Sequence, residues 1–246
     1  FAQYGSDFFI PPPAPQGNRF SVAEIKEPTN ELKNSAAGGR LAHIFSGWDL
    51  SLFYLDGWDH FPAFHRITST GAALSYFPEH HRLAQFGLTL AKDLAGAVVK
   101  SEAIYGLGKF FSVSDLDETD GVLKNDALDY MLGLDYTFKE RVAANLQLIG
   151  RTMIDKTEGS HRLKEQHTAM TLRLRTDFLD FRLVPEVLVV GTIGARDLMV
   201  RPKMSYKHGN HWGFAVGADL FDGITEGLFG QFGDKDRMYA EIKFFL

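Results

Sequence analysis

The chain has 246 residues, no cysteine and a formal net charge of −5 at pH 7. Its length suits one large β domain or two small ones, the lack of cysteine excludes disulfide bonds and thiolate chemistry, and the negative charge argues against a nucleic-acid partner. No apolar run approaches the roughly 18 residues that a transmembrane helix needs, a result that transmembrane β-barrels also give.

Residues 1–37 differ from the rest of the chain. An apolar run at 8–10 suggests a strand, but prolines dominate 11–15. Proline cannot donate to a β ladder and favours an extended polyproline conformation. We therefore predict an extended, proline-containing loop segment, with one short strand at 18–26, in front of a domain at 38–246.

From residue 38 onward, apolar and polar residues alternate, which is the period of a β-strand. In the stretch ALDYMLGLDYTF, for example, Leu132 and Leu134 fall on one face and Asp129 and Asp135 on the other. The same alternation predicts a hairpin at 38–56 and strands at 82–92, 96–105, 127–138, 142–153, 168–178, 181–193, 198–207, 211–221 and 236–246. These are roughly eleven strands of about ten residues, the length that crosses a bilayer at a tilt.

The predicted connections alternate between short and long. Short turns are expected at 93–95, 139–141, 179–180 and 207–210, and long polar loops at 57–81, 111–126, 155–166 and 222–235. The connection at 194–196 is the exception, because it is short but lies at the same end of the strands as the long loops. Short periplasmic turns, long extracellular loops and aromatic residues near both strand ends are typical of outer-membrane barrels.

Two solvents are compatible with this parity. A soluble sandwich or barrel would bury the apolar face, whereas a membrane barrel would turn it to lipid. The regular run of one hairpin after another favours an antiparallel transmembrane β-barrel of about twelve strands. A lysine or arginine facing lipid would cost about 2–4 kcal/mol at the midplane, so the charged face is expected to line the interior.

Nine basic and seven acidic residues have this interior parity. The predicted pore-lining residues are Lys100, Glu102, Asp129, Asp135, Arg151, Arg173, Arg175, Asp177, Arg182, Glu186, Arg201, Lys203, Asp219, Arg237, Glu241 and Lys243. They form either a selectivity field in an open channel or an ion-paired filling that stiffens a nearly closed barrel. Arg173, Arg175, Arg201 and Lys203 are expected to form a basic patch on one wall.

Three stretches resemble a known family: GWDLSLFYLDGWD (47–59), LTLAKDLAGAVVKSEAIY (88–105) and LDYMLGLDYTF (128–138). They are similar to an uncharacterised family of proteobacterial porin-like outer-membrane proteins, over about 35–246. The resemblance implies an outer-membrane location and makes this chain the C-terminal part of a larger barrel. The alternation through Leu246 is also similar to the C-terminal strand that the barrel-assembly machinery reads, although the usual last residue is phenylalanine.

Other candidate sites are weaker. Pro185 and Pro202 lie in the middle of adjacent strands and predict a bulge, with a local opening toward lipid as the alternative. The histidines at 80–81 and at 208 and 211 are expected to be loop and turn residues, because a metal needs three or four convergent ligands. Ser101 has outward parity without an outward histidine, and no G-x-S-x-G element occurs, so we predict no catalytic residue, no metal and no cofactor.

The sequence therefore predicts a porin-like channel or transporter in the outer membrane of a Gram-negative cell, passing a small solute or amphiphile across or laterally out of the barrel. The alternative is a structural or partner-docking barrel with no open pore, whose long loops bind another protein. A periplasmic or envelope protein is the expected partner. The expected surroundings are outer-membrane lipid and lipopolysaccharide, with the barrel-assembly machinery contacting the last strand.

Overall fold

The computed structural model describes residues 20–25, 27–68, 74–113, 119–154, 166–225 and 227–245. Regular structure in these residues is almost entirely strand, and the helical segments among them are two short 3-10 turns, η1 (Leu32–Asn34) and η3 (Gly230–Phe232). In the residues so described, no helix is long and apolar enough to cross a membrane.

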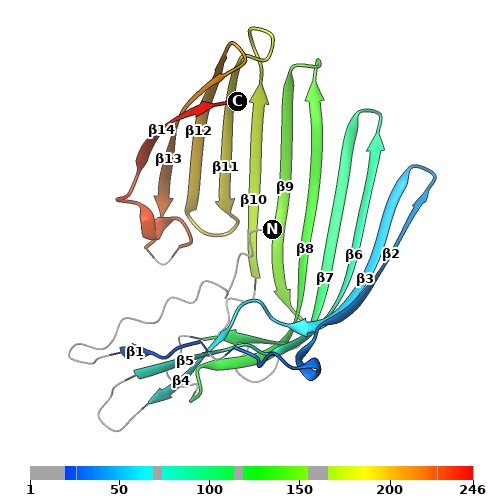
Figure 1. Cartoon of the computed structure of the whole chain (residues 1–246), viewed down its shortest axis with the longest axis vertical. Helices are drawn as coiled ribbons and strands as arrows, with labels where there is room; N and C mark the ends of the chain where they lie inside the picture. The colour runs from blue at the N-terminus through cyan, green and yellow to red at the C-terminus, as the bar shows by residue number, and fades with distance from the viewer. Residues whose placement is uncertain are drawn as a thin grey trace.

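Eleven strands form one antiparallel sheet (Figure 1). Each strand of this sheet pairs with the strands that precede and follow it in the chain. The one interruption is between β3 and β6, where the small β4–β5 hairpin lies outside this sheet. The strands are β2 (Ala37–Phe45), β3 (Trp48–Trp58), β6 (Arg82–Leu94), β7 (Ala97–Ser112), β8 (Val122–Phe138), β9 (Val142–Met153), β10 (Gln166–Thr176), β11 (Leu183–Thr192), β12 (Asp197–His208), β13 (Trp212–Gly223) and β14 (Arg237–Phe244).

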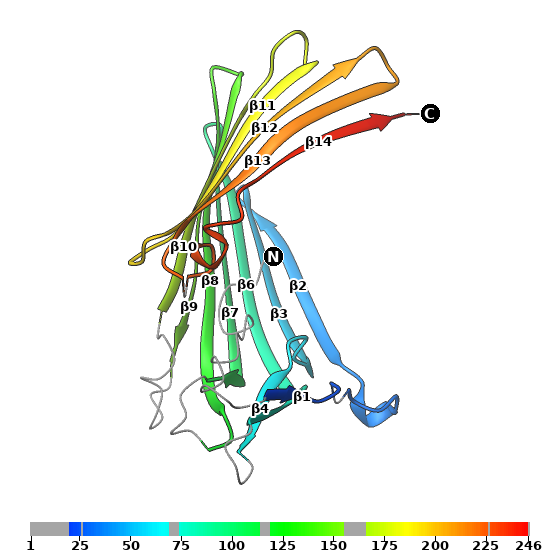
Figure 2. The same cartoon turned by 90° about the vertical axis from the view of Figure 1, so that its left-hand side faces the viewer.

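The sheet ends at β2 and β14. In the described part of the chain each of these strands pairs on one side only, and both bend toward the same side of the central strands, which gives an open trough (Figure 2). The predicted antiparallel sheet is confirmed, but the predicted closure of about twelve strands is not present. The reason is geometric, because the two end strands of an antiparallel sheet with eleven members run in the same direction and cannot pair antiparallel with each other.

A second, three-stranded sheet lies at the lower end of the trough in Figure 1. It consists of β1 (Phe20–Val22), β4 (Ala63–Thr68) and β5 (Leu74–Glu79), with β1 parallel to β5. The prediction that 57–81 is only a loop was therefore wrong, because β4 and β5 are short and do not show the alternation. The expected strand within 18–26 does form, but in this small sheet rather than in the large one.

The long loop predicted at 111–126 is shorter than expected. β7 runs to Ser112 and β8 starts at Val122, so the connection between the two strands is 113–121. A register shift between Gly106 and Lys109 lets β7 continue past the point where its alternation breaks. The loop predicted at 155–166, like the apolar run and prolines of 8–15, falls almost entirely outside the described residues.

Short turns gather at the upper edge in Figure 1 and longer connections at the lower edge. Ser46 and Gly47, the two residues between β2 and β3, both have positive φ, and so do Ala95 and Gly96 between β6 and β7. This is the conformation of tight hairpin turns whose twist matches that of the flanking strands. The predicted segregation of turn lengths is thereby reproduced, including the short connection between β11 and β12 at the lower edge.

The large sheet covers its charged face and exposes its apolar face. Along β8, Met131 on the charged face is 6% exposed, whereas its neighbour Leu132 on the apolar face is 51% exposed. The register continues the apolar face from Leu132 across Leu148 and Met170 on the next two strands. This is the reverse of a water-soluble sheet, which buries the apolar side.

The two mid-strand prolines leave the register unchanged. Pro185 pairs with Met204 and Pro202 with Val187, in one unbroken β11–β12 register. On the other side of β12 the pairs with β13 stop at Val200 and resume at Lys203 without a shift. The predicted bulge at these prolines was wrong, because proline lacks one ladder donor but does not require an inserted residue.

Candidate functional site: the charged face of the trough

The predicted pore-lining residues share one face of the large sheet. Fourteen of the sixteen lie in its strands, and the pairing register carries a common face from one strand to the next, for example from Asp129 to Arg151 and from Glu186 to Lys203. The other two, Asp177 and Arg182, lie in the turn between β10 and β11. This charged face is on the inside of the curve, because the segments that contact it lie on the side toward which β2 and β14 bend (Figure 2).

Most charges on this face are paired across strands. Asp219 on β13 is the strongest case, since its side chain is 2% exposed and accepts from Arg201 on β12 and from Arg237 on β14. The Arg237 Nε to Asp219 Oδ2 distance is 2.6 Å. One buried carboxylate thus links three neighbouring strands through charge-assisted hydrogen bonds.

The same pattern recurs along the sheet. Arg151 Nη2 donates to Asp129 Oδ2 at 2.9 Å. Its guanidinium carbon lies 5.8 Å from the centre of the Phe111 ring. The other cross-strand pairs join Lys100 to Asp135 at 2.5 Å, Arg173 to Glu186 at 2.6 Å and Lys203 to Glu241 at 3.4 Å, and within β14 Lys243 pairs with Glu241 at 3.1 Å.

The predicted basic patch is divided in two. Arg201 belongs with Asp219, so its charge is matched, whereas Arg173, Arg175 and Lys203 line a pocket of about 330 Å³ near the upper edge. The same pocket is also lined by Arg182 and Lys207. Arg182 was predicted as a pore-lining residue outside the basic patch, and Lys207 was not predicted. Sequence parity could have found Lys207, because it continues the alternation of Arg201 and Lys203.

Near the lower edge a loop covers the charged face. Phe229 is buried against Val190 and Met199, which have the same parity as the charged residues of their strands. The backbone N–H groups of Phe229 and Gly230 donate to Asp197 Oδ1 at 2.9 and 2.8 Å. Asp197 was not predicted, because it is the first residue of β12 and the two loop N–H groups that it binds are 32 and 33 residues away in the sequence.

A second buried ion pair was also missed. Lys109 Nζ lies 2.6 Å from Asp59 Oδ2, with side-chain exposures of 5% and 9%. Lys109 follows the register shift in β7, so simple parity from the start of the strand gives it the wrong face. The pair ties the connection after β3 to the inner face of β7.

The small sheet carries a histidine pair. His65 Nε2 and His81 Nε2 are 2.8 Å apart, and the His81 ring stacks on Phe110 at 3.8 Å between centroids. Burial, followed by the nearby charge of His65, lowers the pKa of His81 from its ordinary value. No group of three or more histidine, aspartate or glutamate side chains that could hold a metal ion occurs within the described ranges. His211 is a turn residue, as predicted, and its Nδ1 lies 3.0 Å from the Phe245 carbonyl.

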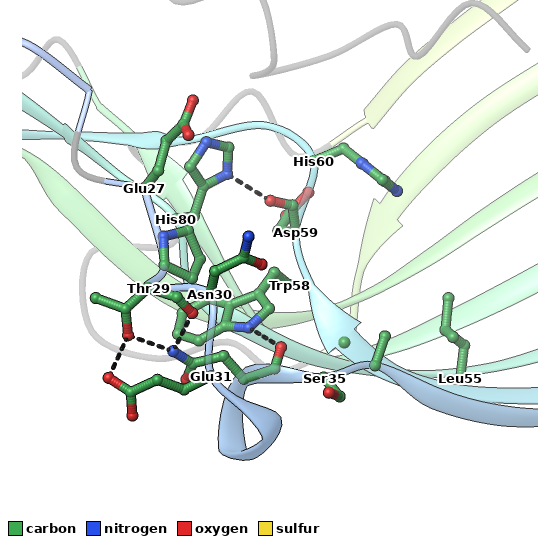
Figure 3. A pocket seen from close by; sticks show the side chains of 14 residues that line it. Glu27, Thr29, Asn30, Glu31, Ser35, Leu55, Trp58, Asp59, His60 and His80 are labelled. Carbon is green, nitrogen blue, oxygen red and sulfur yellow. Dashed lines mark hydrogen bonds between the residues drawn. The ribbon is translucent and has the colours of Figure 1, made fainter.

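A second pocket, of about 420 Å³, lies beside the small sheet and η1 (Figure 3). Trp58 forms its floor and donates from Nε1 to the Asn34 carbonyl at 2.8 Å. His80 Nδ1 lies 2.7 Å from the Asp59 carbonyl oxygen, which holds the ring at the rim. This pocket has acidic and neutral polar walls, in contrast to the basic pocket at the opposite edge of the sheet.

No protein-family model and no curated protein sequence matches the chain. The resemblance to porin-like outer-membrane proteins therefore stays a prediction.

Proposed function

We propose that this chain forms the wall of a transmembrane β-barrel in the outer membrane of a Gram-negative cell, and that the barrel passes a small solute or amphiphile through its charged interior or laterally out of it. The observation that carries the proposal is the reversed burial of the large sheet. Charged side chains of the concave face such as Asp219 and Arg151 are buried in ion pairs, whereas large apolar side chains of the opposite face are exposed.

Water is an unfavourable solvent for such a surface. Leu41 on β2, Leu132 on β8, Val216 on β13 and Ile242 on β14 share the apolar face and are all at least half exposed, so apolar exposure extends from one edge of the sheet to the other. Soluble monomers rarely expose a contiguous apolar patch larger than a few hundred Å². Lipid removes this cost, because acyl chains are as apolar as the side chains themselves.

Aromatic residues support a membrane interface at the upper edge. Tyr136 and Phe138 pack edge to face at 4.5 Å, and Trp212 packs on Phe244 at 5.0 Å between centroids. All four rings lie on the apolar face or at its end and are more than a third exposed. Such rings are enriched where the hydrocarbon region meets the headgroups.

Closure of the barrel requires a further strand. Because β2 and β14 run in the same direction, an odd number of additional strands must lie between them for every pair to remain antiparallel. One is the smallest number, and it gives the even total that bacterial barrels show. Closure would also satisfy the backbone groups along both edges, which lipid cannot do.

The proposed orientation follows from the connections. The edge with the short turns would face the periplasm, and the edge with the small sheet and the η3 loop would face lipopolysaccharide and the outside of the cell. β14 would be the strand that contacts the barrel-assembly machinery.

A sealed barrel that docks a periplasmic or envelope protein is the second candidate. It is favoured by one observation, the cover that Phe229 and its loop place on the charged face near the lower edge. A lumen that is plugged and ion-paired would give a stiff scaffold without conductance.

Two measurements test the proposal on the purified protein. A folded barrel resists unfolding in detergent, so its gel mobility should change on boiling, and insertion into planar bilayers should give discrete conductance steps. Heat-dependent mobility without conductance would favour the sealed barrel. A protein that stays soluble and monomeric without detergent would contradict both candidates.

A further inference from the structure

We infer that the basic pocket formed by β10, β11 and β12 near the short turns is a binding site for a phosphate group or a similarly charged small oxyanion. The pocket is a feature of the sheet, and only its place on the route of a solute rests on the proposed function. The inference names the chemical class of solute that the channel would pass.

The pocket contains a local excess of positive charge. Its lining includes Arg173, Arg175, Arg182, Lys203 and Lys207 against one carboxylate, that of Glu186, which is five cations to one anion. Glu186 contacts Arg173 at 2.6 Å.

The neighbouring acids do not cancel this excess. Glu241 lies 3.4 Å from Lys203 but is shared with Lys243. Asp177 and Asp180 lie in the adjoining turn, and neither is part of the lining. In the described part of the chain, no carboxylate forms an ion pair with Arg175 or Lys207.

This arrangement differs from the rest of the charged face. Elsewhere a carboxylate is placed between bases, as Asp219 is between Arg201 and Arg237, so that the charges compensate one another. Like charges at close range are unfavourable, because two unit charges 4 Å apart repel by about 1 kcal/mol even in bulk water and by more near a protein surface. An excess of bases, on a face where most other bases have a carboxylate partner, points to an external anion that supplies the missing charge.

The register brings the bases within reach of one ligand. Arg175 pairs with Glu186, and Glu186 with Lys203, so the two bases stand on either side of the central strand, about 10 Å apart at the backbone. The Lys207 backbone N–H donates to the Arg182 carbonyl at 2.8 Å, which places these two residues at one level near the turn. Side chains of this length can converge from such positions on one small ion.

The donor chemistry favours an oxyanion. Guanidinium groups offer paired N–H donors in a plane that matches phosphate, sulfate or carboxylate oxygens, and lysine adds a mobile point charge. Arg182 is partly fixed, since its Nε donates to the Leu179 carbonyl at 3.0 Å. The hydroxyl of Ser205, which also lines the pocket, can donate a further hydrogen bond to the same ion.

The test is calorimetric binding to the folded protein in a neutral detergent, with inorganic pyrophosphate as the soluble probe and short-chain phosphatidylglycerol as the lipid probe. Binding of pyrophosphate identifies a free phosphate-bearing solute, and binding of the lipid alone identifies a headgroup as the source. Either result supports the inference. Pyrophosphate binding should weaken as salt is raised, because the Debye length falls from about 10 Å at 0.1 M to about 3 Å at 1 M.

The variant is Arg175→Gln with Lys207→Gln, because neither base holds a carboxylate and their loss leaves no buried charge behind. We expect the affinity for pyrophosphate to fall at least about tenfold, the equivalent of about 1.4 kcal/mol. The matched control is Lys139→Asn with Arg141→Gln in the β8–β9 turn, which removes two charges from the same edge outside the pocket and should leave the affinity within about twofold.

Folding of each variant is checked by heat-dependent gel mobility. If the double glutamine variant does not fold, Arg175→Lys with Lys207→Arg serves as the second test, because it keeps both charges and should retain binding. Absence of binding to either probe by the wild-type protein would overturn the inference, as would equal loss in the control variant. Pyrophosphate binding by a protein that shows no conductance would overturn the open channel and leave the anion site standing.

Discussion

Asp219 shows how single residues set the charged face. A carboxylate with 2% side-chain exposure is costly to bury unless its oxygens are fully used, and here each oxygen meets an arginine from a different strand. The arginines are themselves partly exposed, at 39% and 67%, which lowers the cost of bringing the three charges together. The residue therefore acts as a cross-strand link rather than as an isolated charge.

Replacing Asp219 by asparagine should destabilise the folded protein. The amide removes the charge that both arginines face and can accept at one oxygen only, so we expect a loss of about 1–3 kcal/mol. The control is Asp222→Asn on the same strand, whose pair with Arg196 is exposed and should be worth less than about 1 kcal/mol. Urea unfolding in detergent measures both, and equal effects would contradict the structural role of Asp219.

Leu132→Arg separates lipid from water as the solvent of the apolar face. Replacing a leucine that is 51% exposed to water changes stability by about 0.5 kcal/mol or less, whereas an arginine at the lipid midplane costs about 2–4 kcal/mol. We expect the larger loss, measured as folded yield and urea midpoint. Gln147→Arg on the charged face of β9 is the control and should be tolerated. Met131 would be a poor control, because it is covered and an arginine would not fit.

At the level of the elements, specific contacts attach the small sheet to β7 and to the connection between β7 and β8. The Phe64 N–H donates to Ser112 Oγ at 2.8 Å, and the Arg66 N–H donates to the Asp120 carbonyl at 2.6 Å. His81 adds its stacking on Phe110 and its bond with His65. Because His81 contributes two of these contacts, we expect the small sheet to respond to the protonation of His81.

Acid should loosen the small sheet. The pKa of His81 is lowered in the folded state, so the unfolded state takes up its proton first as the pH falls. The contribution of neutral His81 to the stability of the small sheet is therefore fully present above about pH 6.5, and it is lost as the pH falls from there through the folded pKa. Hydrogen exchange of the β4 and β5 amides should accelerate over this range, and His81→Gln should remove the dependence. His43→Gln, at an exposed position on β2, should keep it.

The parallel direction of the two edge strands, β2 and β14, predicts how far apart they lie in a closed barrel. If one more strand closes the barrel between them, their backbones lie about 10 Å apart, which is too far for a disulfide. Cysteines placed at Leu41 and Ala240 should therefore fail to form a disulfide but react with a bifunctional maleimide that spans the gap. Cysteines at Val216 and Ala240, which are register partners, provide the control for proximity. A disulfide between the first pair would mean direct parallel closure.

For the whole molecule, the two edges of the sheet are chemically different. Short turns and the basic pocket lie at one edge, and the small sheet, the Trp58 pocket and the η3 loop lie at the other (Figure 1). In the proposed orientation the first edge meets the periplasm and the second meets the cell exterior. A solute would then leave or enter the barrel past the basic pocket on the periplasmic side.

Labelling of intact cells tests this orientation. The chain has no cysteine, so a single cysteine can be placed at Lys235, in the β13–β14 connection, or at Glu140, in the β8–β9 turn. An impermeant maleimide should modify position 235 and should reach position 140 only after the outer membrane is opened. The opposite pattern would invert the proposed orientation, and labelling of both in intact cells would argue against membrane insertion.

The sequence by itself determined the strands of the large sheet, their two faces and the order of short and long connections. The β period is local, so alternation in 127–138 or 198–207 shows which residues share a face without knowledge of the partners. The hairpin order then follows from short turns. This is why the ion-paired residues of the charged face between β7 and β14 were predicted. The buried pair of Asp59 and Lys109 lies at an element end and beyond a register shift, and Asp197, which accepts from backbone N–H groups, is the first residue of its strand. The exposed pairs Arg82–Asp56 and Arg196–Asp222 were not predicted either.

Tertiary structure alone decided the rest. Whether Arg201 belongs to an anion site or to Asp219 depends on which strands lie side by side and at what stagger, and parity carries no information on stagger. The small sheet and the Phe229 loop depend on contacts between segments far apart in sequence. The open edges at β2 and β14 follow from the number of strands, because an odd antiparallel sheet brings together two edges of the same direction. Local periodicity fixes what each face is made of, but only long-range pairing fixes which charges meet and which remain for a ligand.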